Sequence, residues 1–106
     1  FLTAYPNLAA IFACDDQMAQ GAGQAVNARG KSNSIFVCGF DGSPNGAQAI
    51  LDGIMDASVA QQPRLMGKTA VEYIVKLIRG ESIEPIIYTD CEMVVASNAK
   101  NFLEWH

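Results

Sequence analysis

The chain has 106 residues, of which 50% are hydrophobic and 17% are charged, so it can build one domain with a modest core and does not have the composition of a disordered segment. Its net charge of −4 and its pI near 4.7, with the seven basic residues scattered, argue against a nucleic-acid partner, because nucleic acids select basic grooves. Its apolar runs are far shorter than the ~20 residues that span a bilayer, which argues against direct insertion into a membrane.

The first half of the chain alternates between strand and helix patterns. Residues 9–14 (AAIFAC) form a short apolar run, which is typical of a parallel strand covered on both faces. The spacing of apolar residues predicts a helix over 15–30, with two acids at its start and a glycine at its end. A second strand is predicted over 35–40 (IFVCGF), and a short helix over 45–53.

The second half continues the alternation. A third strand is predicted over 55–61 and a helix over 63–80, which begins with a proline and ends with a glycine. The apolar stripe of this helix is expected to pack into the core; it consists of Leu65, Met66, Thr69, Ala70, Tyr73, Ile74 and Leu77. A last strand over 91–96 precedes a short terminal helix near Ser97. These elements predict an α/β fold, a Rossmann-like parallel sheet with flanking helices that looks incomplete.

The residues needed for catalysis or for metal binding are scarce. The single histidine is His106, the final residue, so a Ser–His or Cys–His arrangement has no plausible base. Asp15 and Asp16 are the only adjacent acids, which is too few for a metal site. A phosphatase of the haloacid dehalogenase type would need an acid where Gly39 stands. The sequence therefore predicts neither an enzyme nor a cofactor or metal site.

Polar side chains follow all three predicted parallel strands. Asp15 ends the first strand, Asp41 the second and Gln61 the third, and the carboxyl ends of parallel strands meet at one edge of the sheet, where α/β folds bind ligands. Each residue also has a structural explanation, as a helix cap, a turn acceptor and a surface amide respectively. Together, two carboxylates and an amide suit the hydroxyl groups of a neutral polyol or sugar.

Four segments carry a resemblance to a known family. In order, they are IFACDDQMAQGAGQAV, VCGFDGSP, DGIMDASVAQQP and MGKTAVEYIVKLIRGE. The chain resembles the type I periplasmic sugar-binding proteins of the ribose-binding group from about Leu2 to Val95, in the expected order and spacing. In that family two Rossmann-like lobes close on a sugar, and the complex delivers the sugar to an ABC permease or a chemoreceptor. The resemblance implies a periplasmic or extracytoplasmic protein, with a lipid anchor on the full-length parent as an option.

The resemblance also implies roles for individual residues. Asp41 matches the sugar-binding aspartate of the Gly-Phe-Asp-Gly motif, and Gln61 matches a ligand-contacting glutamine at the hinge. Asp15 stands where the family commonly has a sugar-binding asparagine, so an acceptor is kept and a donor is lost. Cys14 stands where ribose binders often have glutamine. Phe40 either faces the ligand or belongs to the core.

The resemblance places this chain at the C-terminal portion of the family, as part of the second lobe, and the start at Phe1 rather than Met fits a fragment. Residues 1–90 are expected to form the partial sugar-binding lobe, and residues 91–106 a strand that crosses the hinge, with its tail. An unpaired strand over 91–96 is expected either to favour self-association of the fragment or to leave residues 91–106 mobile. The expected hinge residues are Gln61, Gln62, Thr89 and Asp90.

Two further hypotheses and one question about the thiols stay open. The effector domain of a LacI-type repressor shares the fold, although the GFDGSP motif and the compact segment after it favour the transport class. An enzyme on the same α/β scaffold is the third hypothesis. The three cysteines are Cys14, Cys38 and Cys91, and each is expected to be a buried free thiol. The alternative is a disulfide that joins Cys14 to Cys38 between neighbouring strands.

Overall fold

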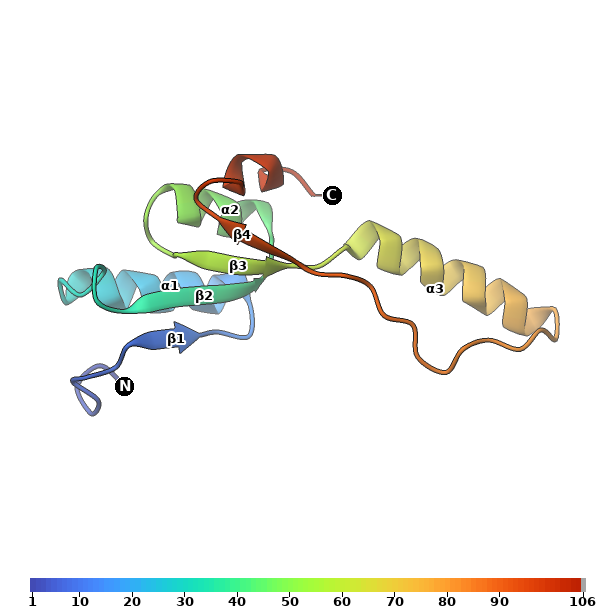
Figure 1. Cartoon of the computed structure of the whole chain (residues 1–106), viewed down its shortest axis with the longest axis horizontal. Helices are drawn as coiled ribbons and strands as arrows, with labels where there is room; N and C mark the ends of the chain where they lie inside the picture. The colour runs from blue at the N-terminus through green and yellow to red at the C-terminus, as the bar shows by residue number, and fades with distance from the viewer. Residues whose placement is uncertain (106) are drawn as a thin grey trace.

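A computed structural model describes residues 1–105; His106, the histidine considered above as a base, lies outside the described residues. Its main body is a four-stranded sheet in the order β1-β2-β3-β4, in which β1, β2 and β3 run parallel and β4 runs antiparallel to β3 (Figure 1). The strands are β1 (Ala10–Phe12), β2 (Phe36–Asp41), β3 (Ala57–Ala60) and β4 (Glu92–Val95). The expected α/β class is confirmed, and the fourth strand differs from an all-parallel sheet.

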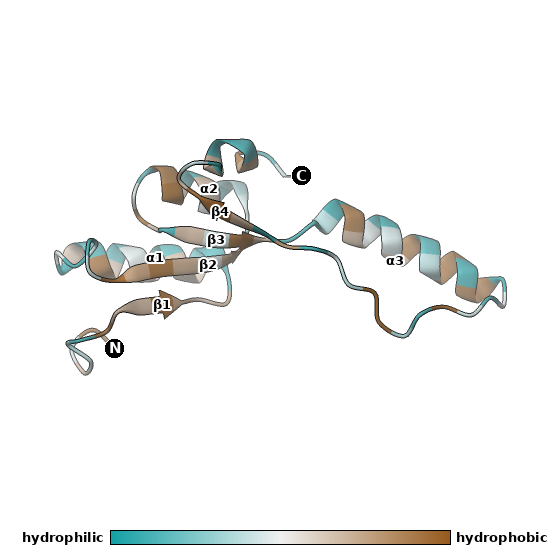
Figure 2. Ribbon diagram, viewed as in Figure 1, coloured by the Kyte–Doolittle hydropathy of each residue, from teal (hydrophilic) through white to brown (hydrophobic). Residues whose placement is uncertain are grey.

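One face of this sheet is covered by α1 (Asp16–Ala28), α2 (Pro44–Leu51) and the 3-10 helix η1 (Ala99–Phe102). Helix α1 begins as predicted, because Asp15 accepts a hydrogen bond from a backbone N–H group of the first turn. Helix α2 begins at Pro44, one residue before the predicted start, and Ser43 caps it in the same way. The core lies between these helices and the strands, which are the most hydrophobic part of the body in Figure 2. Its buried residues include Ala19, Val26, Val37, Ala47, Ile50, Val94 and Phe102.

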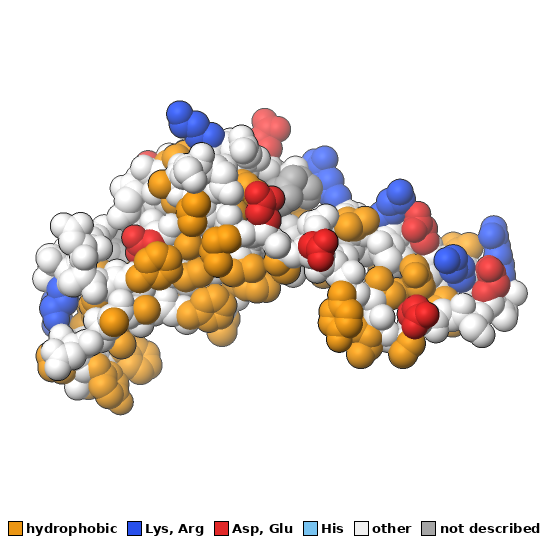
Figure 3. Space-filling view, in the orientation of Figure 1, with side chains coloured by type: hydrophobic (Ala, Val, Ile, Leu, Met, Phe, Trp, Pro, Cys, Tyr) orange, Lys and Arg blue, Asp and Glu red, His pale blue; other side chains and the backbone are white. Residues whose placement is uncertain are grey.

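The opposite face of the sheet has no cover among residues 1–105. Successive side chains of a strand point to opposite faces, and of the set that alternates with buried Val37 and Val94 the large side chains Phe36 and Met93 are open to solvent, whereas the smaller Cys38 is buried. Phe12 is 64% exposed, Phe36 50% and Met93 53%. Hydrophobic side chains accordingly gather over the strands on the face turned to the viewer in Figure 3. A sheet of this class is normally covered on both faces, so this surface is unfinished.

An arm projects from the body, formed by α3 (Pro63–Ile78) and the returning segment 80–90 (Figure 1). None of the residues of α3 is buried, so the expectation that its apolar stripe packs into the core is wrong. The spacing of the apolar residues predicted the helix correctly, but it does not specify which surface packs against the stripe. The chain measures 58 × 30 × 17 Å with a radius of gyration of 17.5 Å, where a compact domain of this size has ~13 Å. No helix within residues 1–105 is long and apolar enough to cross a membrane.

The last strand also corrects the sequence analysis. Residues 91–96 were expected to leave this sheet and to lack a partner, but β4 pairs with β3 over four residues, from Ala57 with Val95 to Ala60 with Glu92. The segment that leaves the body is therefore the arm, and the boundary expected at residue 90 does not separate the last strand from the sheet. The reason is that apolar strand residues indicate burial in a sheet without specifying which sheet.

We predict that hydrogen exchange will separate α3 from the rest of this chain. An isolated helix of this length is marginal in water, and α3 buries no side chain here, so its amides should exchange far faster than those of β3 in a dilute solution of the chain. Helix α1, which buries Ala19 and Val26, is the internal control and should be protected. Protection of α3 equal to that of α1 would contradict the projecting arm.

Candidate functional site

Two of the predicted site residues are in direct contact. Asp41 is the last residue of β2 and Gln61 follows the last residue of β3, so parallel pairing brings both to the same edge of the sheet. The Gln61 side chain donates a hydrogen bond from Nε2 to Oδ1 of Asp41 over 2.8 Å, and the Gln61 backbone N–H donates to the Asp41 carbonyl over 3.2 Å. The carboxylate and the amide are thus held in a fixed relative position, and both are half-buried.

The backbone of Asp41 is unusual. Its φ is +120°, and it is the only residue other than glycine with a positive φ among residues 1–105. Such a conformation costs a non-glycine residue ~1–3 kcal/mol and is found preferentially at functional sites. The next N–H, of Gly42, donates to Oγ of Ser58 over 3.1 Å, which holds the turn against β3. The surrounding hydrogen bonds therefore fix the strained residue.

Asp15 lies at the same edge but has a structural task. It is the N-cap of α1, and its Oδ1 accepts a hydrogen bond from the backbone N–H of Met18 over 2.7 Å. The register that pairs Phe12 with Cys38 points β1 toward the end of β2, and the Ala13 N–H still donates to the Cys38 carbonyl. Asp15 is thus brought to the site edge, while the carboxylate of this residue binds its own helix rather than the Asp41–Gln61 pair.

The neighbouring acid, Asp16, is the residue that sequence reasoning undervalued. Only 1% of its surface is exposed, and its carboxylate accepts from the Ser43 N–H over 2.8 Å, from the Ser43 hydroxyl over 2.7 Å and from the Ser58 hydroxyl. Ser43 in turn accepts from the Gly46 N–H as the cap of α2. One buried carboxylate therefore ties together the start of α1, the turn after β2 and the strand β3. No spacing rule joins these three positions in the sequence.

Two glycines leave the space that the Asp16 carboxylate occupies. A Cβ atom added to Gly39 would lie 2.4 Å from Oδ1 of Asp16, and one added to Gly46 would lie 2.2 Å from Oδ2. Any side chain at either position would displace the carboxylate. The glycine before Phe40 in the CGFDG sequence is thus explained by packing rather than by ligand contact.

The four predicted hinge residues gather where the chain leaves the body and returns. Gln61 and Gln62 follow β3, and Thr89 and Asp90 precede β4, so the two connections run side by side at the end of the sheet. The side chain of Gln62 donates from Nε2 to the Asp90 carbonyl over 2.9 Å and links them. The structure brings these four residues together, which is the arrangement that a hinge requires.

Phe40 directly precedes Asp41 and pairs with Val59 of β3. It alternates with Asp41 along β2 and shares its face with Phe36 and Cys38, which is the uncovered side of the sheet. The side chain is half-buried there. Both expectations for Phe40, ligand contact and core packing, stay predictions.

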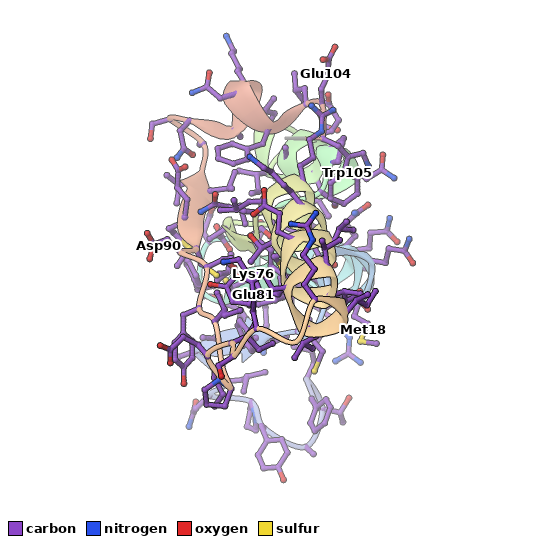
Figure 4. The ribbon with its side chains drawn as sticks, turned by 90° about the vertical axis from the view of Figure 1, so that its right-hand side faces the viewer. Met18, Lys76, Glu81, Asp90, Glu104 and Trp105 are labelled. Carbon is purple, nitrogen blue, oxygen red and sulfur yellow. The ribbon has the colours of Figure 1, made fainter. Side chains whose placement is uncertain are left out.

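A pocket opens beside the Asp41–Gln61 pair. Both side chains line it, together with Pro63 and Met66 from the first turn of α3 and with Trp105 from the C-terminal tail. Sequence reasoning missed Trp105, because this residue lies 44 positions after Gln61 and belongs to no motif. In the view along the arm, Asp90 and Trp105 lie on opposite sides of α3 (Figure 4).

The thiols differ from the expectation of three buried groups. Cys38 is buried, whereas Cys14 and Cys91 are exposed, and all three are free, so no disulfide joins Cys14 to Cys38. Burial, and then the negative charges of Asp16 and Asp56, raise the pKa of the Cys38 thiol above its usual value. This thiol therefore stays protonated at neutral pH.

Among residues 1–105 no three His, Cys, Asp or Glu side chains are grouped so that they could hold a metal ion.

The fold is an open α/β sheet with polar side chains at its carboxyl edge, which is where domains of this class bind small molecules. A comparison with protein families agrees: residues 1–82 match the periplasmic binding protein domain. The chain belongs to the periplasmic binding protein domain family. The resemblance to periplasmic sugar-binding proteins found in the sequence is thereby confirmed.

Similar proteins of this family include import proteins for sugars. The chain is 42% identical over 94 residues to the ribose import binding protein RbsB of Escherichia coli K12, covering 89% of this chain and 31% of that protein. It is 36% identical over 81 residues to the D-allose-binding periplasmic protein of the same organism, covering 76% of this chain and 26% of that protein. The chain thus spans about a third of the length of the ribose import binding proteins that it matches.

Solved structures agree with this assignment. An ABC transporter periplasmic solute-binding protein from Actinobacillus succinogenes 130z, with bound D-allose, superposes with a TM-score of 0.82 at 35% identity, covering 94% of this chain and 36% of that one. A solute-binding protein from Agrobacterium vitis, with bound D-fucose, gives a TM-score of 0.79 at 32% identity, covering 97% and 37%. The sheet and the arm described above therefore recur in intact binding proteins.

We predict that the two adjacent acids differ sharply in their contribution to stability. Asp16→Ala leaves the Ser43 and Ser58 donors without their buried acceptor and should lower the free energy of unfolding by about 3 kcal/mol or more. Asp15→Ala removes one helix cap and should cost about 1 kcal/mol. Urea unfolding of both variants measures the difference. Equal losses would show that the Asp16 network does not organise the fold.

Proposed function

We propose that this chain supplies one half of the sugar site of an ABC importer's solute-binding component. The observation that carries the proposal is the Asp41–Gln61 pair, hydrogen-bonded at the carboxyl edge of the sheet, in a chain of the periplasmic binding protein family. Relatives named as import proteins for ribose and as binding proteins for D-allose favour transport over the repressor hypothesis. Their description as binding proteins also favours binding over catalysis.

The chemistry of the edge suits a neutral sugar. Gln61 fixes the Asp41 carboxylate through one oxygen, and a carboxylate has further lone pairs that accept hydrogen bonds from sugar hydroxyls. Asp15 adds a second carboxylate, one oxygen of which is engaged by the cap of α1. Two negative groups at one edge repel phosphate and favour uncharged polyols. Because Asp15 stands where the family has an asparagine, the sugar hydroxyl that faces Asp15 should act as a donor.

We further propose a division of the chain between two lobes that revises the boundary expected from the sequence. The sheet with α1, α2, β4 and η1 belongs to one lobe, and the arm, residues 63–90, belongs to the other. Two observations support the division: α3 buries none of its residues against the sheet, and the two connections to the arm run side by side, joined by the Gln62–Asp90 hydrogen bond. Gln61, Gln62, Thr89 and Asp90 then form the hinge between the lobes.

The partners of the complete protein follow from the same proposal. A small sugar is the ligand, and the permease of an ABC importer or a chemoreceptor receives the loaded protein. The location is periplasmic or extracytoplasmic, as the family description and the names of the relatives suggest.

We predict that Asp41→Ala, made in the two-lobed protein that contains this chain, weakens the binding of D-ribose or D-allose at least tenfold. A hydrogen bond to a charged acceptor contributes about 1.5–3 kcal/mol, and 1.4 kcal/mol corresponds to one decade of affinity. Titration calorimetry with both sugars measures the loss. Asp52→Ala, which removes an exposed acid at the end of α2, is the matched control and should bind as the wild type does.

The same variants separate ligand binding from folding. The melting temperature of the unliganded protein should change little in Asp41→Ala, because the strained backbone at this position gains nothing from the carboxylate beyond the Gln61 bond. If the melting temperature collapses while the affinity is kept, Asp41 is a turn residue and the proposed role is wrong.

The fragment by itself should associate. The sheet face that carries Ala10, Phe12, Phe36 and Met93 would be covered in the complete protein, and in its absence we propose that a second copy covers it. Sedimentation of the chain over a range of concentrations should give a dimer or larger species, and Phe12→Ser combined with Phe36→Ser should shift it toward the monomer. Tyr88→Ser, a change at an exposed aromatic of the arm, is the control. A monomer at every concentration would contradict self-association.

A further inference from the structure

The C-terminal tail is anchored so that its last described residues return to the site. Asn98 fastens the tail to β4, since the Val95 N–H donates to Oδ1 of Asn98 over 2.8 Å and Nδ2 of Asn98 donates to the Met93 carbonyl over 3.0 Å. Ala99 and Phe102, on η1, are buried in the core. The tail is therefore a fixed part of the body, and its direction after η1 is set by these anchors.

This direction brings Trp105 to the pocket of Asp41 and Gln61. The indole lines the pocket together with Pro63 and Met66, and 51% of its surface is exposed. The pocket thus has two polar groups on the sheet side and three apolar groups around them. Ligand pockets commonly combine an apolar, aromatic lining with a few polar groups that orient the ligand.

A small sugar matches this division. Its hydroxyl groups form hydrogen bonds at the ring edge, while the C–H bonds on a ring face are apolar and pack against a flat aromatic surface. Tryptophan offers the largest such surface of any side chain. Within this chain, Asp41 and Gln61 alone would contact hydroxyls and leave the apolar face of the ring without a partner.

We propose that Trp105 is a ligand-contacting residue that packs against the apolar face of a small sugar held by Asp41 and Gln61. This inference rests on the proposed sugar-binding function. It extends the site to the C-terminal tail, a segment that none of the sequence motifs reaches. The alternative is that Trp105 only packs on Pro63 and Met66 where the chain enters the arm, in which case the indole is a spacer beside the hinge.

The test compares three variants of the two-lobed protein that carries this chain: Trp105→Ala, Trp105→Phe and Leu103→Ala. Leu103 is a partly exposed residue of the same tail and serves as the matched control. Calorimetry with D-ribose and D-allose should give about tenfold weaker binding for Trp105→Ala, near wild-type binding for Leu103→Ala, and recovery of most of the affinity in Trp105→Phe, whose ring keeps an apolar face. Thermal unfolding verifies that each variant is folded.

Fluorescence adds a readout that a purely structural role would not move. Trp105 is the only tryptophan of this chain, so the difference between the emission spectra of the wild type and Trp105→Phe isolates its signal. We expect addition of the sugar to change this difference spectrum and to protect it from quenching by acrylamide.

The outcomes distinguish this inference from the function on which it rests. If Asp41→Ala loses sugar binding while Trp105→Ala binds within twofold of the wild type, the sugar site stands and the role of Trp105 is wrong. If Trp105→Ala keeps its sugar affinity but changes the hinge opening of the unliganded protein, as measured by small-angle scattering, Trp105 is a spacer and the proposed ligand contact is wrong. If the wild type binds neither sugar nor any of a panel of pentoses, hexoses and inositols, both proposals fail.

Discussion

The buried carboxylate of Asp16 is the interaction on which the rest of this structure depends. It accepts from Ser43 and Ser58, and so fixes the first turn of α1, the loop between β2 and α2, and the middle of β3 relative to one another. Ser58 also accepts from the N–H of Gly42, the residue after Asp41. A buried charge is costly unless its hydrogen bonds are satisfied, and here each bond that satisfies it also positions a segment of the site.

The hydrogen bonds of this network also hold the residues of the candidate site in position. Asp41 keeps a positive φ because the turn beside it is held by Ser58 on one side and by pairing with β3 on the other. Gln61 then meets the Asp41 carboxylate without any adjustment of the loops. The side of the site that belongs to the sheet is therefore preorganised, and ligand binding need not bear the cost of ordering it.

The exposed helix α3 and the uncovered sheet face have the same physical explanation. An amphipathic helix that buries nothing and a sheet face that exposes Phe12, Phe36 and Met93 both lack their covering layer within residues 1–105. The chain spans about a third of its relatives, whose structures extend well beyond it. Each surface is explained if the remaining part of a two-lobed protein covers it, with the arm packed into one lobe and the open sheet face completed in the other.

The sequence by itself determined the class of the fold and most of the elements, since periodicity, caps and glycines act within a few residues; α1, α2 and β2 begin and end close to their predicted bounds. It also indicated Asp41 and Gln61, because both follow apolar runs that end at one edge of a sheet. Only the tertiary structure decided the rest. The apolar stripe of α3 does not specify the surface that covers it, and the apolar residues after residue 90 do not specify the strand with which they pair. Neither the Asp16 network nor Trp105 has a local sequence signature. Contacts between residues 27 and 42 positions apart, such as those of Asp16 with Ser43 and Ser58, arise only when the strands pair.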